Sequence, residues 1–495
     1  TLSLNILTDS PIVSCFDTNV IIGGNISSGS SSVFYDISGN YYLSGTYNGS
    51  LNIGDTVLSS IGGTDLYLAK YNSCGKFLWA IRAGSSDNDA NGDVVADQSG
   101  NIYWVGTYKQ TFNVYGNNGT GYTASQVTNN EGFLVKLTSN GAVLWGSNLA
   151  GGSNENMNEV IVDNMDNVIV SAGFNGCCPS SFNATITGPN GSQNVTATNP
   201  NYGTGLIIKY NSSGDILWYG TLQSRDASMV GLSVDAANNI YTVSSFRTWN
   251  NAEPAQFMDS AGTINTLYNP GIGLGYLIKL NASGVWQWGV TFGNGGDGSS
   301  SLTHATDVEV DASGNPWVCG YFSGSTASFY STSASPQTLD TALTSKGFIV
   351  QYSDSGNVLK LIEHMQLGSD IYLTGLKFGN NNLGLSGYFS ASGSSGAKDI
   401  LHLVYDFNGT QKDIIHSGGI NDEIANDIVF DGNYFVLSGV ADSTAIIGID
   451  TFTNANNYLW RLAPAVNTGE NYNYSWSTGD TSSTIHVNPP HTTNY

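Results

Sequence analysis

The sequence predicts an all-β protein, a seven-bladed β-propeller, and three observations carry that prediction. Two different short motifs each recur seven times along the chain, and a repeat of this length marks a fold built from equivalent units. Runs of β-branched and aromatic residues alternate with turn residues, and no amphipathic helical pattern interrupts them. The 61 glycines and 27 tyrosines suit twisted strands joined by many tight turns.

The first motif is a strand, a tight turn and a second strand, in which a lysine precedes a glycine by five positions and a tryptophan by nine. Asn-Ser-Gly residues at the turn supply the positive φ and the side-chain caps of a tight hairpin. The lysines of the four complete copies are Lys70, Lys136, Lys209 and Lys279, and their tryptophans are Trp79, Trp145, Trp218 and Trp288. Weaker copies follow at 347–360 and 399–412, and a truncated copy ends the series at 457–463.

The second motif has an Asp-Ser-Gly-Asn turn between two strands and alternates with the first. Its copies lie at 36–47, 97–108, 163–174, 235–246, 311–322, 379–389 and 431–440. Each unit is therefore a strand, an Asp-type turn, a strand, a variable loop, a strand, an Asn-type turn and a last strand. Four antiparallel strands, repeated seven times around a ring, describe a β-propeller.

These units resemble the bacterial seven-bladed β-propeller repeat family. The signature of that family is an Asp-x-x-Gly-Asn-x-Tyr strand followed by a Lys-x-x-x-x-Gly-x-x-x-Trp hairpin, and the likeness covers residues 33–463. It is stronger in the first four copies than in the last three. The resemblance implies a propeller that is secreted or exposed at the cell surface, as in Bacteroidota-like proteins, and it names no ligand.

The ends of the repeat series predict how the ring closes. The last copy stops after its third strand, and a strand-like segment at Val20–Gly23 precedes the first copy. We expect this segment to supply the outer strand of the seventh blade, which removes an exposed edge. The expected domains are a donor-like strand at 1–14, the propeller at 15–463 and a partial immunoglobulin-like β segment at 464–495.

That last segment rests on a second resemblance. The stretch NYSWSTGDTSSTIHV (473–487) resembles the core of bacterial surface immunoglobulin-like domains, in which a further alternating strand follows the Thr-Thr-x-Tyr pattern seen here at 492–495. TLSLNILTDSP (1–11) alternates in this way. One interpretation is that this strand of a neighbouring subunit fills a groove on the tail; the other, of similar weight, is that it covers its own propeller. The interface residues of the first interpretation are Leu2, Leu4, Ile6, Trp476, Ile485 and Val487.

Composition and charge exclude several classes of partner. The net charge of −23 argues against binding to nucleic acid or anionic lipid. No apolar run approaches the roughly 18 residues of a membrane span, and the start at Thr1 fits a processed secreted protein. Five cysteines leave at least one outside an intramolecular disulfide. The neighbours Cys177 and Cys178 fit either a vicinal disulfide or a plain loop tip.

No motif indicates catalysis, a metal or a cofactor. The repeated aspartates are expected to cap their own turns, and the repeated lysines to reach a carboxylate or carbonyl, since a buried unpaired ammonium is costly. The tryptophans are expected to pack between blades rather than to bind sugars. No Ser-His-Asp order, phosphate loop or metal spacing of histidines occurs. We therefore expect a protein that is not an enzyme.

Two kinds of short pattern indicate attached glycans. Asn-x-Ser/Thr sequons include those at Asn48, Asn118 and Asn190. Asp-Ser/Thr-x triplets, similar to the O-glycosylation triplet of Bacteroidota, place candidate sites at Thr56, Ser260, Thr341 and Ser443.

The sequence thus favours a structural function. We expect a glycosylated subunit of an extracellular filament or surface fibre, joined head to tail to copies of itself by strand complementation. The alternative is a cell-surface adhesin or lectin-like propeller that binds glycans or proteins through the loops of one rim.

Overall fold

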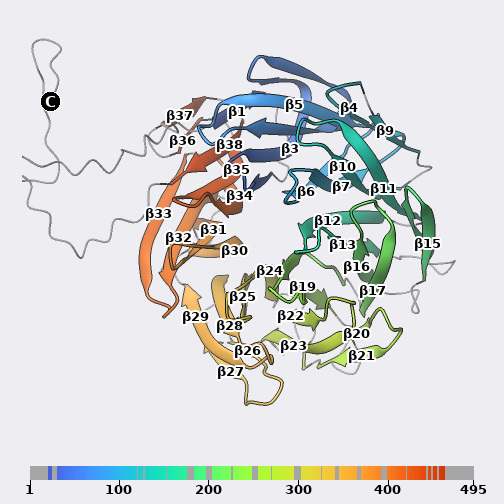
Figure 1. The fold of residues 1–495 in the computed structure, drawn as a ribbon. Helices are drawn as coiled ribbons and strands as arrows, with labels where there is room; N and C mark the ends of the chain where they lie inside the picture. Colours follow the sequence, from blue (N-terminus) through green and yellow to red (C-terminus); the bar gives the residue numbers. More distant parts are fainter. Residues whose placement is uncertain are drawn as a thin grey trace, which may run out of the picture.

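The computed structural model contains strands, turns and irregular connections, and no α-helix within the residues it describes (Figure 1). The strands form seven blades around a central axis, so the predicted seven-bladed propeller is confirmed. No helix long and apolar enough to cross a membrane occurs in the described part. The described residues are 20–24, 31–119, 121–125, 129–152, 154–175, 183–196, 203–224, 227–247, 255–268, 270–271, 273–294, 303–324, 326–340, 345–364, 369–391, 398–419, 421–441, 444–447, 450–453 and 456–462.

Each blade is an antiparallel sheet of four strands, ordered from the axis outward. Blade 1 consists of β2 (Ser32–Tyr35), β3 (Tyr41–Ile53), β4 (Thr56–Tyr71) and β5 (Phe77–Gly84). Blade 2 consists of β6 (Ala90–Ala96), β7 (Ile102–Tyr108), β10 (Glu131–Leu137) and β11 (Val143–Gly151). Blade 3 consists of β12 (Asn154–Val162), β13 (Val168–Asn175), β16 (Gly203–Tyr210) and β17 (Ile216–Ser224). Blade 4 consists of β18 (Gly231–Val234), β19 (Ile240–Arg247), β22 (Gly273–Leu280) and β23 (Trp286–Asn294). Blade 5 consists of β24 (Thr303–Val310), β25 (Pro316–Phe322), β28 (Lys346–Tyr352) and β29 (Val358–His364). Blade 6 consists of β30 (Ser369–Gly379), β31 (Asn382–Ala391), β32 (Lys398–Asp406) and β33 (Gln411–Gly419). Blade 7 consists of β34 (Glu423–Phe430), β35 (Phe435–Ala441), β38 (Asn456–Arg461) and β1 (Val20–Gly24).

The seventh blade closes the ring with both ends of the described chain. β1 pairs with β38 in an antiparallel register that sets Val20 opposite Leu459 and Gly23 opposite Asn456. This confirms the predicted closure by Val20–Gly23. The same strand also pairs with the extended end of β3, through Gly24 and Leu51, so blade 7 is joined directly to blade 1.

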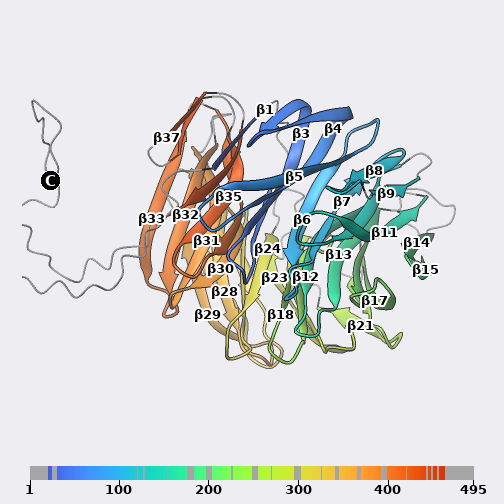
Figure 2. The same cartoon turned by 45° about the horizontal axis from the view of Figure 1, so that its top comes forward.

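The connection between the second and third strands of a blade is more than the variable loop predicted from the sequence. In five blades it contains a hairpin that pairs with the outer strand of the preceding blade, and these hairpins lie on the outside of the ring (Figure 2). Such pairing covers an outer edge. The hairpins are β8 (Phe112–Tyr115) with β9 (Gly121–Ala124), β14 (Asn183–Gly188) with β15 (Gly191–Thr196), β20 (Ala255–Met258) with β21 (Ile264–Leu267), β26 (Thr326–Phe329) with β27 (Gln337–Asp340), and β36 (Thr444–Ile447) with β37 (Asp450–Thr453).

The Asp-type turns form as the sequence predicts. In blade 1, Oδ1 of Asp36 accepts hydrogen bonds from the N–H groups of Ser38 and Asn40, at 2.9 and 2.8 Å. The turn needs one residue with positive φ, which is Gly39 in blade 1, Asp166 in blade 3 and Asn238 in blade 4. Aspartate and asparagine tolerate this conformation better than other residues with a Cβ, so the motif survives without its glycine.

The hydrophobic core lies between adjacent blades rather than within one. Valines, leucines and tyrosines of neighbouring sheets pack face to face; Val105 of blade 2 and Met157 of blade 3, for example, belong to one buried cluster. Among the described cysteines, Cys74 is disulfide-bonded and Cys319 is a buried free thiol. The expected terminal strand and immunoglobulin-like segment, with Leu2, Leu4, Ile6, Trp476, Ile485 and Val487, lie outside the described residues.

The two ends of the ring differ in what they carry. The turn rim holds the Asp-type and Asn-type turns, such as 36–40 and 72–76. The loop rim, at the opposite ends of the strands, holds the connections between second and third strands and those that lead to the next blade. β1 begins and β38 ends at the turn rim of blade 7, so Val20 and Leu462, the first and last residues that the structure describes, both lie at this rim.

Candidate functional site

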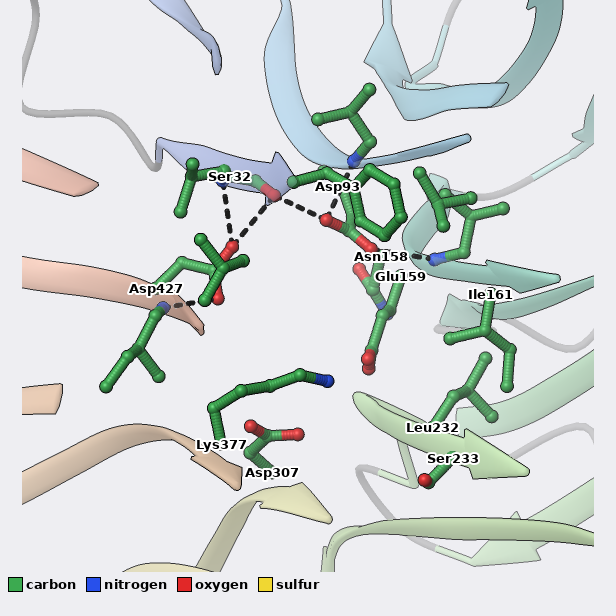
Figure 3. A pocket seen from close by; sticks show the side chains of 18 of the residues that line it. Ser32, Asp93, Asn158, Glu159, Ile161, Leu232, Ser233, Asp307, Lys377 and Asp427 are labelled. Atoms are coloured by element: carbon green, nitrogen blue, oxygen red, sulfur yellow. Dashed lines mark hydrogen bonds between the residues drawn. The ribbon is translucent and has the colours of Figure 1, made fainter. Parts of the chain in front are cut away.

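A cavity of about 490 Å³ lies on the propeller axis, lined by the innermost strand of every blade (Figure 3). Its walls carry an unusual number of ionisable groups for a channel of this size. Glu159, Lys377 and Asp307 extend toward one another across it, and Ser32 lies between Asp93 and Asp427.

All of these channel groups except Lys377 occupy one repeated position, four residues before the first residue of the Asp-type turn. In blade order the position holds Ser32, Asp93, Glu159, Gly231, Asp307, Gly375 and Asp427. In five of these strands the register with the second strand shifts at this point, which is a β-bulge. In four of them the residue left out of the ladder is the one just before this position, such as Thr306 before Asp307, and the bulge bends the strand and changes the direction of the side chains around it. The sequence analysis missed this position, although its acidic residues recur at a constant distance from the turn.

The carboxylates at this position connect neighbouring blades. Asp93, Asp307 and Asp427 each accept a hydrogen bond from the next N–H of their own strand and another from the residue that follows the equivalent position in the next blade. Asp93 accepts from the N–H groups of Val94 and Val160 (2.7 and 3.1 Å), Asp307 from those of Val308 and Leu376 (2.7 and 2.8 Å), and Asp427 from those of Ile428 and Val33 (2.7 and 2.9 Å). The hydroxyl of Ser32 donates to Asp93 and, at 3.0 Å, to Asp427.

The same carboxylates repel one another electrostatically. Burial and the nearby Asp427 raise the pKa of Asp93 to about 7. Burial and Glu309 raise the pKa of Asp307 to about 8. Burial, reinforced by Asp307, Asp93 and Asp427, raises the pKa of Glu159 well above its usual value. The channel therefore holds protons on acids that are ionised in water at neutral pH.

One cation partly balances these acids. Lys377 Nζ lies 2.8 Å from Glu309 Oε1. Burial works to lower the pKa of Lys377, but Glu309, Asp307 and Asp427 outweigh it and raise that pKa. Throughout the described ranges, no group of three or more His, Cys, Asp or Glu residues is arranged to hold a metal ion. The channel geometry is that of inter-blade contacts, with carboxylate oxygens occupied by backbone N–H groups.

The four motif lysines lie in equivalent sites, as predicted. Each is buried, and its ammonium donates to a backbone carbonyl in the Asn-type turn of the next blade. Lys70 donates to Ser139 O (3.1 Å), Lys136 to Ser212 O (2.8 Å), Lys209 to Ala282 O (3.0 Å) and Lys279 to Asp354 O (3.5 Å). Three of them also pair with carboxylates: Lys136 with Asp97 at 3.8 Å, Lys209 with Asp163 at 2.8 Å, and Lys279 with Asp354.

The motif tryptophans share those contacts. The indole N–H of Trp79 donates to the Ser139 carbonyl at 3.3 Å, and those of Trp145 and Trp288 donate to the Ser212 and Asp354 carbonyls at 3.2 and 2.8 Å. These tryptophans therefore pack between blades, as the sequence predicts. Neither they nor the lysines converge on one place, because each occupies the same position in a different blade.

Most candidate glycosylation sites lie on the surface. Asn48 and Asn118 are exposed. Asn190 is exposed as well, but its Nδ2 donates to Asp215 Oδ1 at 2.7 Å, and this is the atom to which a glycan would attach. Thr56 is half-buried at the tip of the β3–β4 hairpin. The hydroxyl of Ser260 donates to Ser283 O at 2.6 Å, whereas Thr341 and Ser443 lie outside the described residues.

A row of aromatic rings follows the loop rim across blades 5 and 6. His304 stacks on Tyr321, with ring centroids 5.0 Å apart, and Tyr321 meets the edge of Tyr372 at 4.8 Å. Tyr372 in turn stacks on Tyr388 at 4.9 Å. All four side chains are half-buried. The equivalent positions of blade 2 hold Ala90 and Thr107, so this aromatic arc belongs to one side of the ring. The sequence analysis missed it because the four residues come from separate repeats.

Comparisons with known proteins find distant similarities. The chain is a seven-bladed β-propeller. No family model matches it. An uncharacterised WD repeat-containing protein of Acanthamoeba polyphaga mimivirus is 24% identical over 290 residues, which are 52% of this chain and 19% of the relative. The chain thus spans about a fifth of the curated relative that it matches (19%).

Solved structures similar to this propeller include enzymes and proteins without a stated activity. Virginiamycin B lyase from Staphylococcus aureus shares 10% identity over 75% of this chain and 94% of its own, with a TM-score of 0.32. A DUF4221-family protein from Bacteroides vulgatus shares 10% over 74% and 90% (TM-score 0.32), and the NanB sialidase from Streptococcus pneumoniae shares 9% over 89% and 70% (TM-score 0.35). These similarities say nothing of the activity of this chain.

Proposed function

We propose that this chain is a structural subunit of an extracellular filament or surface fibre. Copies join head to tail when the strand at residues 1–11 of one subunit pairs with the tail at 464–495 of the next. The observation that carries the proposal is that the propeller is complete without these segments. Residues 20–24 and the strands between Ser32 and Arg461 already supply four strands to every blade.

The place where the two segments leave the ring supports an exchange between copies. Val20 and Leu462, from which these segments continue, lie at the turn rim of blade 7, and we propose that the donor strand of one subunit reaches the tail of the next from this rim. A strand able to pair with its own tail is also able to pair with that of a neighbour, which is domain swapping. Main-chain hydrogen bonds supply affinity, and the alternating Leu2, Leu4 and Ile6 side chains specify register.

The experiment compares the purified full chain with three variants by negative-stain electron microscopy. The full chain forms filaments, and a variant without residues 1–8 stays folded but monomeric. Leu4→Asp abolishes filaments because it places a charge on the apolar face of the strand, whereas Ser3→Asp, on the opposite face, leaves them intact. Filaments of normal length from the truncated chain or from Leu4→Asp would refute the proposal.

Further properties belong to the same proposal. A chain in which only 11% of residues are charged, with many Ser, Thr and Asn, suits a secreted protein that carries glycans at some of the exposed sequons. The subunit is proposed to act without catalysis or a cofactor, with other copies of itself as partners. Mass spectrometry of the native protein tests glycosylation at Asn48 and Asn118.

A second candidate function is that of a cell-surface binding module, similar to an adhesin or lectin. The observation in its favour is the aromatic arc of His304, Tyr321, Tyr372 and Tyr388 on the loop rim. Half-exposed aromatic rings offer large, rigid contact areas to a ligand. Binding of the purified chain to a glycan array tests this function independently of polymerisation, because the arc lies at the opposite rim from Val20 and Leu462.

A further inference from the structure

Cys74 is disulfide-bonded, and its partner lies outside the described residues. Cys74 is half-buried in the Asn-type turn 72–76 of blade 1. Cys319, the other cysteine within the described ranges, is a free thiol and therefore not the partner. The remaining candidates in the chain are Cys15, Cys177 and Cys178. The described strands that flank these candidates decide between them.

Cys177 and Cys178 belong to a connection whose described ends both lie at the loop rim. β13 ends there at Asn175, and β14 begins at Asn183 beside the end of β11. The eight residues of β13 alone span roughly 23 Å between the two rims. From Asn175, the three residues to Cys178 extend at most roughly 11 Å, and the Cα atoms of a disulfide lie within about 7 Å of each other. Neither cysteine therefore reaches Cys74 at the turn rim.

The hairpin between β3 and β4 connects the ring-closing strand β1 to the turn that carries Cys74. Gly23 of β1 pairs with Asn52 of β3 in an antiparallel register, so going back along β1 from Gly23 leads toward the tip of this hairpin. At the tip, a Cβ on Gly54 would come within 2.3 Å of the ring of Phe77, so the two residues are in direct contact. Phe77 begins β5 and follows Cys74 by three positions. The start of β1 therefore lies beside the turn of Cys74.

The chain before β1 is long enough to reach this turn. Cys15 precedes Val20 by five positions, and five extended residues span up to roughly 17 Å. Val20 lies at the turn rim, as Cys74 does. Of the three candidates, Cys15 is thus the one whose flanking strand lies at the same rim and beside the same blade.

The ring-closing strand is short for its task. β1 has five residues, of which four pair with β38 and two with β3. Within the described part of the chain, blade 7 has no other outer strand. Segments near a chain end fray unless they are tied down, so a covalent bond just before β1 would stabilise the closure directly.

We propose that Cys74 is bridged to Cys15 and that this bridge anchors β1 in the seventh blade. In forming the S–S bond, the two thiols lose two protons and two electrons to a protein disulfide, which becomes a dithiol. β1 is then held at both ends, by the chain that leads into blade 1 and by the bridge, which lowers the conformational entropy of the opened state. The inference does not depend on filament formation, although the oxidising compartment that such a bond needs is the one expected of a secreted protein.

The first experiment maps the bond in the unreduced full chain, by alkylation of free thiols, digestion with trypsin and mass spectrometry. Cleavage after Lys and Arg places Cys15 in peptide 1–70, Cys74 in 71–76, Cys177 and Cys178 in 137–209, and Cys319 in 280–346. We expect peptide 71–76 to be linked to peptide 1–70. A link from 71–76 to 137–209, a link between two copies of 71–76, or an alkylated Cys74 would overturn the proposal.

The second experiment removes the bridge from the full chain with the double variant Cys15→Ser/Cys74→Ser. Its thermal midpoint should fall by about 5 °C, and the amides of β1 and β38 should exchange hydrogen about 10-fold faster. Cys15→Ser alone should cause the same loss, because a single bond is lost in either case. Cys177→Ser/Cys178→Ser is the matched control and should change neither quantity. If the double variant keeps the wild-type midpoint and exchange, or if the control loses as much, the bridge does not anchor β1.

Discussion

At the scale of single residues, this propeller places charge where it joins one blade to the next. The ammonium of Lys209 is buried beside Asp163 and also donates to Ala282 O of blade 4. The channel carboxylates do the same near the axis, with backbone N–H groups as donors. In both cases partners on two blades offset the free-energy cost of burying a charge. Removing one such side chain therefore affects the whole contact between two neighbouring blades.

The buried lysine site leads to a stability prediction. Lys209→Met should lower the free energy of unfolding by about 3–5 kcal/mol, because it leaves the carboxylate of Asp163 buried without its cation. Lys412→Met is the control, since Lys412 pairs with Asp406 at a similar 2.8 Å but is 38% exposed; its cost should stay below about 1 kcal/mol. Urea unfolding followed by tryptophan fluorescence measures both. Equal losses in the two variants would contradict this account of the site.

The channel acids lead to a pH prediction. Asp307 has a pKa of about 8 in the folded chain and an ordinary value of 3.8. Between these values the folded state binds more protons than the unfolded state, so this group's contribution to stability is present at low pH and is lost as the pH rises toward 8. Asp307→Asn removes that loss. The free energy of unfolding of the variant, relative to that of the wild type, should therefore increase as the pH is raised from 5 to 8.

Urea unfolding at several pH values measures the difference in the free energy of unfolding between the variant and the wild type. Groups that titrate in the same way in both chains do not contribute to this difference. Asp406→Asn serves as the reference, because Lys412 holds the pKa of Asp406 at about 2 and no titration of this group falls between pH 5 and 8. Its difference from the wild type should be constant over that range. A constant difference for Asp307→Asn as well would show that Asp307 is ionised throughout.

At the scale of strands and hairpins, the ring protects its own edges. An unpaired outer strand is a template for aggregation, and here the outer strands of blades 1 to 4 and 6 each pair with a hairpin from the following blade. The outer strand of blade 7 pairs with the extension of β3. Blade 5 differs within the described residues, because β29 pairs only with β28.

The ring-closing strand gives a test at this scale. Deleting residues 1–24 removes β1 and exposes the edges of β38 and β3. We expect this variant to lose roughly 1 kcal/mol for each ladder hydrogen bond removed and to aggregate through the new edges. Deleting residues 1–14 keeps β1 and should leave the thermal midpoint of the propeller unchanged. Size-exclusion chromatography and thermal unfolding compare the two, and equal midpoints would show that β1 is dispensable.

At the scale of the whole molecule, neighbouring blades are joined at three distances from the axis. The bulge carboxylates join them at the channel, the motif lysines and tryptophans join them at the turn rim, and the hairpins join their outer edges. At each distance most joints link a blade to the one that follows it, so the repeat propagates around the ring until β1 closes it.

The sequence by itself determined the blade count, the turns, the lysine sites and the ring closure. Each of these follows from a short motif read within one repeat: an aspartate four residues before an asparagine caps a turn wherever it occurs, and Asp36 does so through the Ser38 and Asn40 N–H groups. The place of Val20–Gly23 in the seventh blade was predictable as well. The repeat series lacks one strand at its end and has one extra strand before its start, so the extra strand completes the last blade.

Only the tertiary structure decided which side chains meet in the channel and in the aromatic arc. Asp307 and Asp427 each follow a β-bulge, at Thr306 and Asn426, and the alternation of a regular strand does not reveal a bulge. Tyr321 and Tyr372 lie 51 positions apart in two blades, and their meeting depends on the angle at which those blades pack. The hairpins likewise pair outside their own repeat. The physical reason is common to all three: a repeat motif specifies the contacts within a blade, whereas the curvature of the closed ring sets the contacts between blades.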